Sequence, residues 1–221
     1  MTTETDLVLA RLVERHGTLF SEELGLDLTQ NTPSVLFRWL CAALLMSARI
    51  SHETATAAAR ALSDAGWTTA ERMAESKWED RVRVLNGSGY ARYDESTARM
   101  IGDTARRLQD DYDGDLRKLR AASENDPEGQ RAALKAFKGI GDTGADIFLR
   151  ELQTVWPEHY PRLDGKARGA ARRLGLPDKA GRLAERVGRE RFARLVTALV
   201  RADLADIDRS DVLEEAEEAG R

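Results

Sequence analysis

Hydrophobic and polar positions along this chain follow a helical spacing almost everywhere, and turn residues separate the segments. Thr32 precedes Pro33, a favoured first residue of a helix, and an apolar helix is expected from there to Met46. An alanine-rich helix is expected to open at Ser51 and to stop near Gly66. We find neither a convincing strand pattern nor a repeat of solenoid length, so the pattern predicts an all-α fold.

Capping signals predict further helices in the rest of the chain. Thr68 and Ser76 each precede a glutamate by three residues, which is the capping-box pattern at a helix start. Asp94, Asp115 and Asp126 are placed to begin the next three helices. The last helices are expected near residues 165–174, 178–187, 188–202 and 207–219.

A glycine turn between two predicted helices is the most informative segment. Gly139, Ile140 and Gly141 form this turn, and the second helix is expected to open near Thr143. Glycine adopts positive φ and has no side chain to hold a ligand away, so backbone N–H groups can approach an anion. The start of a helix adds unpaired N–H groups and the positive end of the helix dipole. The segment therefore predicts a site for one phosphate of a nucleic-acid backbone.

Three segments in one order resemble the helix-hairpin-helix DNA glycosylase superfamily of the endonuclease III type. The hairpin, Phe137–Ala145, fits the pattern Leu-x-Gly-[Ile/Val]-Gly-x-x-Thr-Ala except at its Leu and Thr positions. Leu163–Lys166, followed by Arg173–Leu176, is similar to the segment that carries the family's catalytic aspartate. Upstream, Leu44–Arg49 resembles the family's Leu-Leu-Ser-Ala-Gln segment. The resemblance covers about residues 33 to 176.

This resemblance implies a two-lobed, glycosylase-like helical fold with a cleft between the lobes. The central lobe is expected to comprise residues 33–140, including the first hairpin helix. The second lobe is expected to combine the N- and C-terminal helices, residues 1–32 and 141–221. The implied partner is double-stranded DNA that carries a damaged or mismatched base.

Asp164 is the candidate catalytic residue that the resemblance implies. Breaking a base–sugar bond passes through an oxocarbenium-like sugar, and a nearby carboxylate can stabilise its positive charge or activate water. The target base must first leave the stack, which is easiest for a damaged or mismatched base. Asp164 also suits the N-cap of the helix that follows, and the two roles can coexist. The implied activity is that of a DNA N-glycosylase of base excision repair.

Two departures from the family limit what the resemblance implies. Bifunctional members carry a lysine two residues after the second hairpin glycine, which forms a Schiff base and permits strand cleavage. Thr143 stands there instead, so we expect base removal without lyase cleavage, with Lys138 and Lys166 as the nearest substitutes. The family's common iron–sulfur loop needs four cysteines, and this chain has one, Cys41. We therefore expect no iron–sulfur cluster and no other cofactor, while a monovalent cation at the hairpin carbonyl groups stays open.

DNA contacts are expected at the hairpin and at a few flanking residues. The expected DNA-binding residues are Lys138, Gly139, Ile140, Gly141, Thr143, Gly144, Arg49 and Lys166. Arg49 stands where family members fill the gap left by a flipped base, with a surface salt bridge as the alternative. Tyr90 and Tyr93 lie where the family has a loop near the base pocket, with packing in the core as the alternative. Asp142 opposes binding, because as an N-cap it would compete with a phosphate for N–H groups.

Charge is unevenly distributed along the chain. The net charge of −4 and the pI near 5.6 argue against a strongly basic protein. Residues 160–201 contain twelve basic and four acidic residues, whereas residues 203–221 contain eight acids and two arginines. The basic stretch from Arg162 to Arg201 would attract phosphates even in an acidic chain, and a solvated arginine-rich surface is the alternative.

The chain is expected to be a monomeric cytoplasmic protein, associated with the nucleoid, that does not bind membranes. Its longest apolar run, Leu40 to Met46, is far shorter than the ~20 residues of a membrane span. The N-terminal residues have no basic and no apolar region of a secretory signal. His16, His52 and His159 lack metal-ligand spacing, so no metal site is expected.

Two other functions stay open. One is a helix-hairpin-helix DNA-binding protein without catalysis, with which Thr143, Asp142 and the acidic pI are compatible. The other is a helical interaction protein that binds a partner through its acidic tail, Asp203 to Glu218. In a glycosylase, Asp164 would line a cleft that faces the hairpin. Salt-dependent affinity for DNA would separate both DNA-binding functions from the interaction protein.

Overall fold

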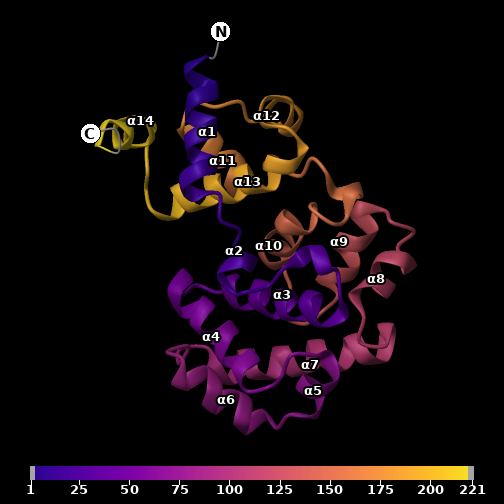
Figure 1. The fold of residues 1–221 in the computed structure, drawn as a ribbon. Coiled ribbons are helices and arrows are strands. Elements are labelled where there is room, and N and C mark those ends of the chain that lie inside the picture. Colours follow the sequence, from indigo (N-terminus) through magenta and orange to yellow (C-terminus); the bar gives the residue numbers. More distant parts are fainter. Residues whose placement is uncertain (1–2, 219–221) are drawn as a thin grey trace. The chain divides into compact units, whose positions relative to one another are not determined.

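The computed structural model describes the backbone of residues 3–218 and the side chains of residues 3–213. Over this range the chain folds into helices joined by turns and loops, and none of the described residues is in a strand (Figure 1). The prediction of an all-α fold is confirmed. Nowhere in the described part is a helix both long enough and apolar enough to cross a membrane.

The chain divides into two compact units. They are Met1–Glu22 with Arg150–Arg221, here called unit 1, and Glu23–Leu149, called unit 2. Residues 23–32 and 141–149 belong to unit 2, although the sequence grouped them with the terminal segments. One reason is that Trp39 Nε1 donates a buried hydrogen bond to Phe148 O at 3.1 Å, which ties the second hairpin helix to the apolar helix beginning at Pro33. A cleft between two lobes stays a prediction.

Unit 2 is built around the apolar helix α3 (Pro33–Met46), whose side chains are mostly buried. Its other elements are η1 (Leu28–Gln30), α4 (His52–Asp64), α5 (Ala70–Glu75), α6 (Trp78–Gly87), α7 (Asp94–Tyr112), α8 (Leu116–Ala122), α9 (Pro127–Lys135) and the first part of α10 (Asp142–Leu152). Thr32 caps α3 and Pro33 is its first residue, as predicted. Cys41 of α3 is one of these buried residues, and burial raises the pKa of its thiol to about 12.

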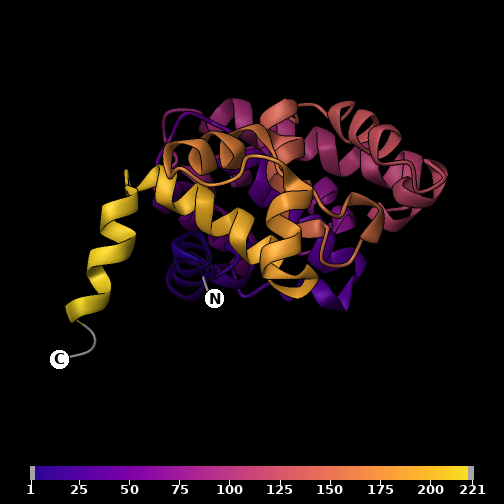
Figure 2. The ribbon, with the colours of Figure 1, turned by 90° about the horizontal axis from the view of Figure 1, so that it is seen from above.

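Unit 1 is organised around α13, against which α1, α11 and α12 pack (Figures 1 and 2). Its helices are α1 (Glu4–His16), η2 (Pro157–His159), α11 (Gly165–Arg173), α12 (Ala180–Val187), α13 (Arg189–Leu204) and α14 (Arg209–Glu218), while α2 (Phe20–Glu23) crosses the boundary between the units. Phe192, Leu195 and Leu199 of α13 are almost completely buried, as are Leu9 and Leu12 of α1. The N- and C-terminal helices therefore share one core.

Two predicted helix starts are wrong by one residue. Thr69, not Thr68, is the N-cap of α5, and its hydroxyl accepts a hydrogen bond from Arg72 N at 3.3 Å. Ser76 ends α5 instead of starting α6, because its hydroxyl donates to Met73 O at 2.6 Å. A serine side chain can close one helix as readily as it can open the next, so the capping pattern alone does not choose between them.

A buried arginine joins three helices of unit 2. Arg81 in α6 donates from Nε to Ala98 O of α7 at 2.9 Å and from Nη1 to Ser76 O at 2.6 Å. Burial is the main cause that lowers the pKa of Arg81. Gly102 on α7 provides the room for this side chain, since a Cβ there would lie 2.5 Å from Arg81 Nη2.

Candidate nucleic-acid interface

A tight turn over residues 136–141 joins α9 to α10 in unit 2. Phe137 and Ile140 are buried, and Ile140 N donates to Phe137 O at 3.1 Å. Lys138 and Gly139, between these two residues, are exposed, and so is Gly141. The two apolar side chains thus anchor the turn, and its backbone is left facing solvent.

The two hairpin glycines have different roles. Gly139 has a φ of 90°, and a Cβ there would lie only 2.7 Å from Met100 Sδ. Thr104 donates from Oγ1 to Lys138 O at 3.1 Å, so α7 holds the turn in place. A Cβ on Gly141 would meet no atom within 4 Å. Gly139 is therefore required for the shape of the turn, and Gly141 leaves its surface open.

The start of α10 has backbone N–H groups that lack hydrogen-bond acceptors. The first intrahelical bond runs from Ala145 N to Gly141 O at 3.0 Å. The N–H groups of Asp142 and Thr143 precede it, and neither is bonded to any residue that the structure describes. Both residues are exposed, and the positive end of the helix dipole lies at the same place. A phosphate oxygen can accept from groups in this arrangement.

Asp142 does not cap the helix that it begins. Its Oδ1 accepts from Arg131 Nη1 and from Lys135 Nζ, each at 2.7 Å. The hydrogen bonds from these two cations hold the pKa of Asp142 below its ordinary value, and the bond from Lys135 has the larger effect. The ionised side chain therefore turns towards α9, and the competition through N-capping that the sequence suggested does not occur.

The segment that ends α3 lies beside the hairpin. A Cβ on Gly139 would come within 3.3 Å of Leu44 Cδ1, and one on Gly144 within 3.7 Å of Ser47 Cβ. Arg49, just beyond, is exposed and has no hydrogen bond or ion pair with the described residues. The structure thus brings two of the three resembling segments together in unit 2, and the alternative of a surface salt bridge at Arg49 is not observed.

The two candidate tyrosines differ in exposure. Tyr90 is 1% exposed, its hydroxyl donates to Leu45 O at 3.4 Å, and burial raises its pKa. Tyr93 is half-buried, with the Arg92 guanidinium 5.2 Å from the centre of its ring. Tyr90 therefore has the packing role that the sequence left as its alternative, and Tyr93 stays the candidate for stacking on a base.

Asp164 has donors at both carboxylate oxygens. It is the N-cap of α11, which confirms that predicted role, and its Oδ1 accepts from Lys166 N at 3.0 Å and from Ala167 N at 3.1 Å. Its Oδ2 accepts from Arg150 Nε at 2.7 Å. The side chains of Asp164 and Arg150 are 1% and 4% exposed. The carboxylate is therefore part of a buried ion pair as well as a helix cap.

The balance of effects keeps Asp164 ionised. Burial is the largest effect and raises its pKa, but attraction to Arg150 opposes it, together with the hydrogen bonds from Arg150, Ala167 and Lys166. The net pKa of Asp164 lies below its ordinary value. Asp164 lies in unit 1, whereas the hairpin lies in unit 2.

Several basic side chains of the stretch in unit 1 pair with nearby acids. Asp203 lies 2.8 Å from Lys166 Nζ and also pairs with Arg173. Further pairs are Arg172–Asp178, Arg186–Asp6 and Arg194–Glu22. Within the described part of the chain, the basic side chains of this stretch without a hydrogen bond, ion pair or ring contact are those of Lys179, Arg182 and Arg191. Acids outside the stretch, Asp6, Glu22 and Asp203, therefore offset part of its positive charge.

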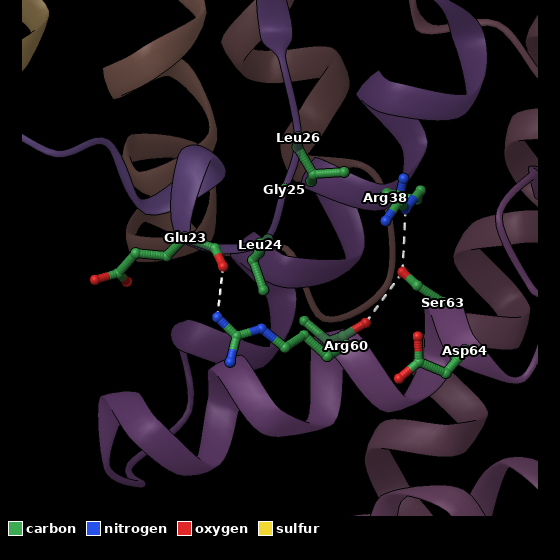
Figure 3. Close-up of a pocket in the computed structure, with 9 residues that line it drawn as sticks. Glu23, Leu24, Gly25, Leu26, Arg38, Arg60, Ser63 and Asp64 are labelled. Atoms are coloured by element: carbon green, nitrogen blue, oxygen red, sulfur yellow. Dashed lines mark hydrogen bonds between the residues drawn. The ribbon is translucent and has the colours of Figure 1, made fainter.

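Unit 2 also contains a cavity of about 330 Å³ that none of the predicted site residues lines (Figure 3). Arg38 Nε donates to Ser63 Oγ at 3.1 Å, and Arg60 Nη2 donates to Glu23 O. Asp64 adds a carboxylate to the lining. Side chains of both charges thus surround the cavity, and no residue of the hairpin is among its lining.

Sequence reasoning missed three cations that contact the predicted site. Arg131 and Lys135 are four residues apart on α9, a spacing that puts both side chains on one face of a helix next to the hairpin. The sequence therefore contained a signal for these two residues. No sequence signal pointed to Arg150, because its pairing with Asp164 depends on the path of the loop between them. The side-chain amide of Gln153 holds this loop through hydrogen bonds with the backbone C=O and N–H groups of Arg162.

The described residues contain no group of three or more His, Cys, Asp or Glu side chains that could hold a metal ion. Comparison of the chain with models of protein families, with curated proteins and with solved structures found no match. The hairpin and Asp164 are therefore the features of the molecule that bear on its function.

Proposed function

We propose that this protein binds the backbone of double-stranded DNA through the hairpin between α9 and α10, like the helix-hairpin-helix proteins that it resembles. The observation that carries the proposal is the exposed turn, where the N–H groups of Asp142 and Thr143 have no acceptor among the described residues. Gly141 leaves the approach to these groups open. A phosphate would accept from them, and because they read no base edge, binding should show little sequence preference.

Cations on unit 2 support this proposal. Lys138 is 64% exposed, and its Nζ lies 3.3 Å from Asp103 in a surface pair weak enough to yield to a phosphate. Arg49 is exposed and unpaired among the described residues. The N–H groups and these two cations offer only a few contacts to phosphates, and acids offset part of the charge of the basic stretch in unit 1. Binding should therefore be modest and should depend on salt.

Titration of two short duplexes of unrelated sequence tests this function. We expect similar affinities for both, and a loss of about tenfold or more between 50 and 200 mM salt, because each phosphate contact releases counterions. Affinity that does not depend on salt, or no detectable binding at low salt, would overturn the proposal.

Base removal by Asp164 is the second candidate function. The protein would then be a monomeric, cytoplasmic DNA glycosylase without a cofactor, acting on a damaged or mismatched base. The observation in its favour is that Asp164 is ionised at the start of α11, because an ionised carboxylate can stabilise an oxocarbenium-like sugar. Against it, both carboxylate oxygens are bonded and Arg150 offsets the charge. DNA binding is therefore the better supported function.

A cleavage screen tests the second candidate. Duplexes that each carry one damaged base are incubated with the protein, and alkali then reveals abasic sites. Because Thr143 offers no amine, borohydride should trap no covalent adduct, and strands should break only after alkali. A trapped adduct would contradict this and would point to Lys138 or Lys166. No base release from any duplex would leave DNA binding as the function.

A further inference from the structure

We propose that Arg131 and Lys135 form a second phosphate-binding site beside the hairpin, and that Asp142 occupies this site when DNA is absent. The inference rests on the proposed DNA-binding function. It assigns to Asp142 the role of an internal competitor that lowers the affinity of the hairpin for DNA.

Two cations converge on a single anionic oxygen in this cluster. Arg131 Nη1 and Lys135 Nζ each lie 2.7 Å from Asp142 Oδ1. Arg131 is oriented by a second acid, with its Nη2 3.4 Å from Asp146 Oδ1. A carboxylate oxygen and a phosphate oxygen are both anionic acceptors, and guanidinium and ammonium groups bind either of them. The Asp142 carboxylate therefore stands where a phosphate oxygen could be bound.

The cation pair lies close to the first phosphate site. Asp142 is the first residue of α10, so the two cations meet within one side-chain length of its own unbonded N–H group. A DNA strand presents its phosphates in series, so one can lie at the N–H groups and a neighbour at the cations. A shallow surface hollow of about 430 Å³ adjoins the pair and is lined by Glu128, Arg131, Ala132, Lys135 and Ala136.

The ion pairs are weak enough to be exchanged. The side chain of Asp142, which both pairs share, is 69% exposed, that of Lys135 is 39% exposed and that of Arg131 is 20% exposed. Exposed ion pairs contribute little to stability, so a phosphate that arrives with the rest of a DNA strand can displace the carboxylate. The displaced Asp142 then lies near two phosphates and repels them. Its presence makes the hairpin bind DNA less tightly than its cations would allow.

Titrations of a short duplex with wild-type protein, Asp142→Asn and Asp80→Asn test the inference. Asp80 pairs with Arg83 at 2.8 Å on the surface of α6 in the same unit, so Asp80→Asn is a control that changes the net charge equally. Asp142→Asn should bind the duplex about fivefold tighter than wild type, because it frees both cations and removes the repulsion. Asp80→Asn should bind like wild type.

A second pair of variants identifies the cations. In the background Arg131→Gln/Lys135→Gln, the gain from Asp142→Asn should fall below about twofold, because no cation remains to be freed. A gain that persists in this background, or that Asp80→Asn matches, would overturn the inference in favour of general repulsion. If wild type binds the duplex and Asp142→Asn binds equally, the second site is overturned and the proposed function stands. If neither wild type nor any variant binds the duplex, both are overturned.

Discussion

An asparagine at position 164 would keep the N-cap of α11 but would leave Arg150 without its buried anionic partner. Arg150 Nε donates to Asp164 Oδ2 at 2.7 Å, and the two side chains are 4% and 1% exposed. Asparagine caps a helix about as well as aspartate, so the capping contribution is retained. The expected loss of stability therefore comes from the arginine charge that stays buried.

The structure sets the size of this loss. Removing one partner of a buried ion pair costs about 3 to 5 kcal/mol of folding free energy, because the other charge is left uncompensated. The amide oxygen of asparagine can still accept from Arg150, so we expect the lower end, about 3 kcal/mol. Asp178→Asn is the matched control in the same unit, because Arg172 pairs with Asp178 at 2.7 Å on the surface. That change should cost at most about 1 kcal/mol.

The same ion pair predicts sensitivity to acid. The pKa of Asp164 in the fold lies below its ordinary value of 3.8. The stability that ionised Asp164 contributes is therefore fully present at a pH above its ordinary pKa. This stability is lost as the pH falls through the lower pKa that Asp164 has in the fold. Wild-type protein should lose stability in this acidic range, and Asp164→Asn should lose less there.

Urea denaturation followed by circular dichroism measures the free energy of unfolding of the three proteins at neutral and at acidic pH. If Asp164→Asn loses no more stability at neutral pH than Asp178→Asn, the reasoning about the buried pair is refuted. Adding Arg150→Met to Asp164→Asn should recover most of the loss, because the uncompensated charge is then removed.

Three further predictions follow from single contacts. Gly139→Ala should cost about 2 kcal/mol of stability, because φ is 90° there and the added Cβ would lie 2.7 Å from a methionine sulfur. As the control, Gly141→Ala should unfold at nearly the same urea concentration as the wild-type protein. Gly102→Ala should cost about 1 to 3 kcal/mol, because its Cβ would lie 2.5 Å from Arg81 Nη2, and an unchanged thermal midpoint would contradict this. Burial raises the pKa of Glu151 above its ordinary 4.5. The stability that its protonated form contributes is therefore lost as the pH rises through the pKa of Glu151 in the fold. Glu151→Gln should flatten this decline of stability in a pH series of urea titrations. An equal decline in both proteins would contradict the last of these.

Features that depend on local chemistry could be predicted from the sequence. Thr32 and Pro33 set the start of α3, and the hairpin turn follows from Gly139, whose conformational freedom the turn requires. The N-cap role of Asp164 is equally local, because its oxygen bonds N–H groups two and three residues ahead. Such signals lie within a few residues of the atoms that they control.

Contacts between segments distant in the sequence could not be predicted in the same way. The partner of Asp164 is Arg150, and the path of the intervening loop decides that pairing. For Tyr90 the sequence left stacking on a base and packing in the core open, and the structure buries its ring and bonds its hydroxyl to Leu45 O. Some acids that pair with the basic stretch, such as Asp6, lie far from it in the sequence. Pairing of charges is a property of the tertiary fold.

Gly141 gives the most direct test that the hairpin binds duplex DNA. A Cβ at this position meets no atom within 4 Å and φ is not positive, so Gly141→Val should fold normally while its side chain blocks the approach of a phosphate. Gly87 in α6 of the same unit is equally open, so Gly87→Val is the matched control. In an anisotropy titration of a short duplex at low salt, wild type and Gly87→Val should bind equally, and Gly141→Val about tenfold more weakly. Equal binding by Gly141→Val, or no binding by the wild-type protein, would contradict DNA binding through the hairpin.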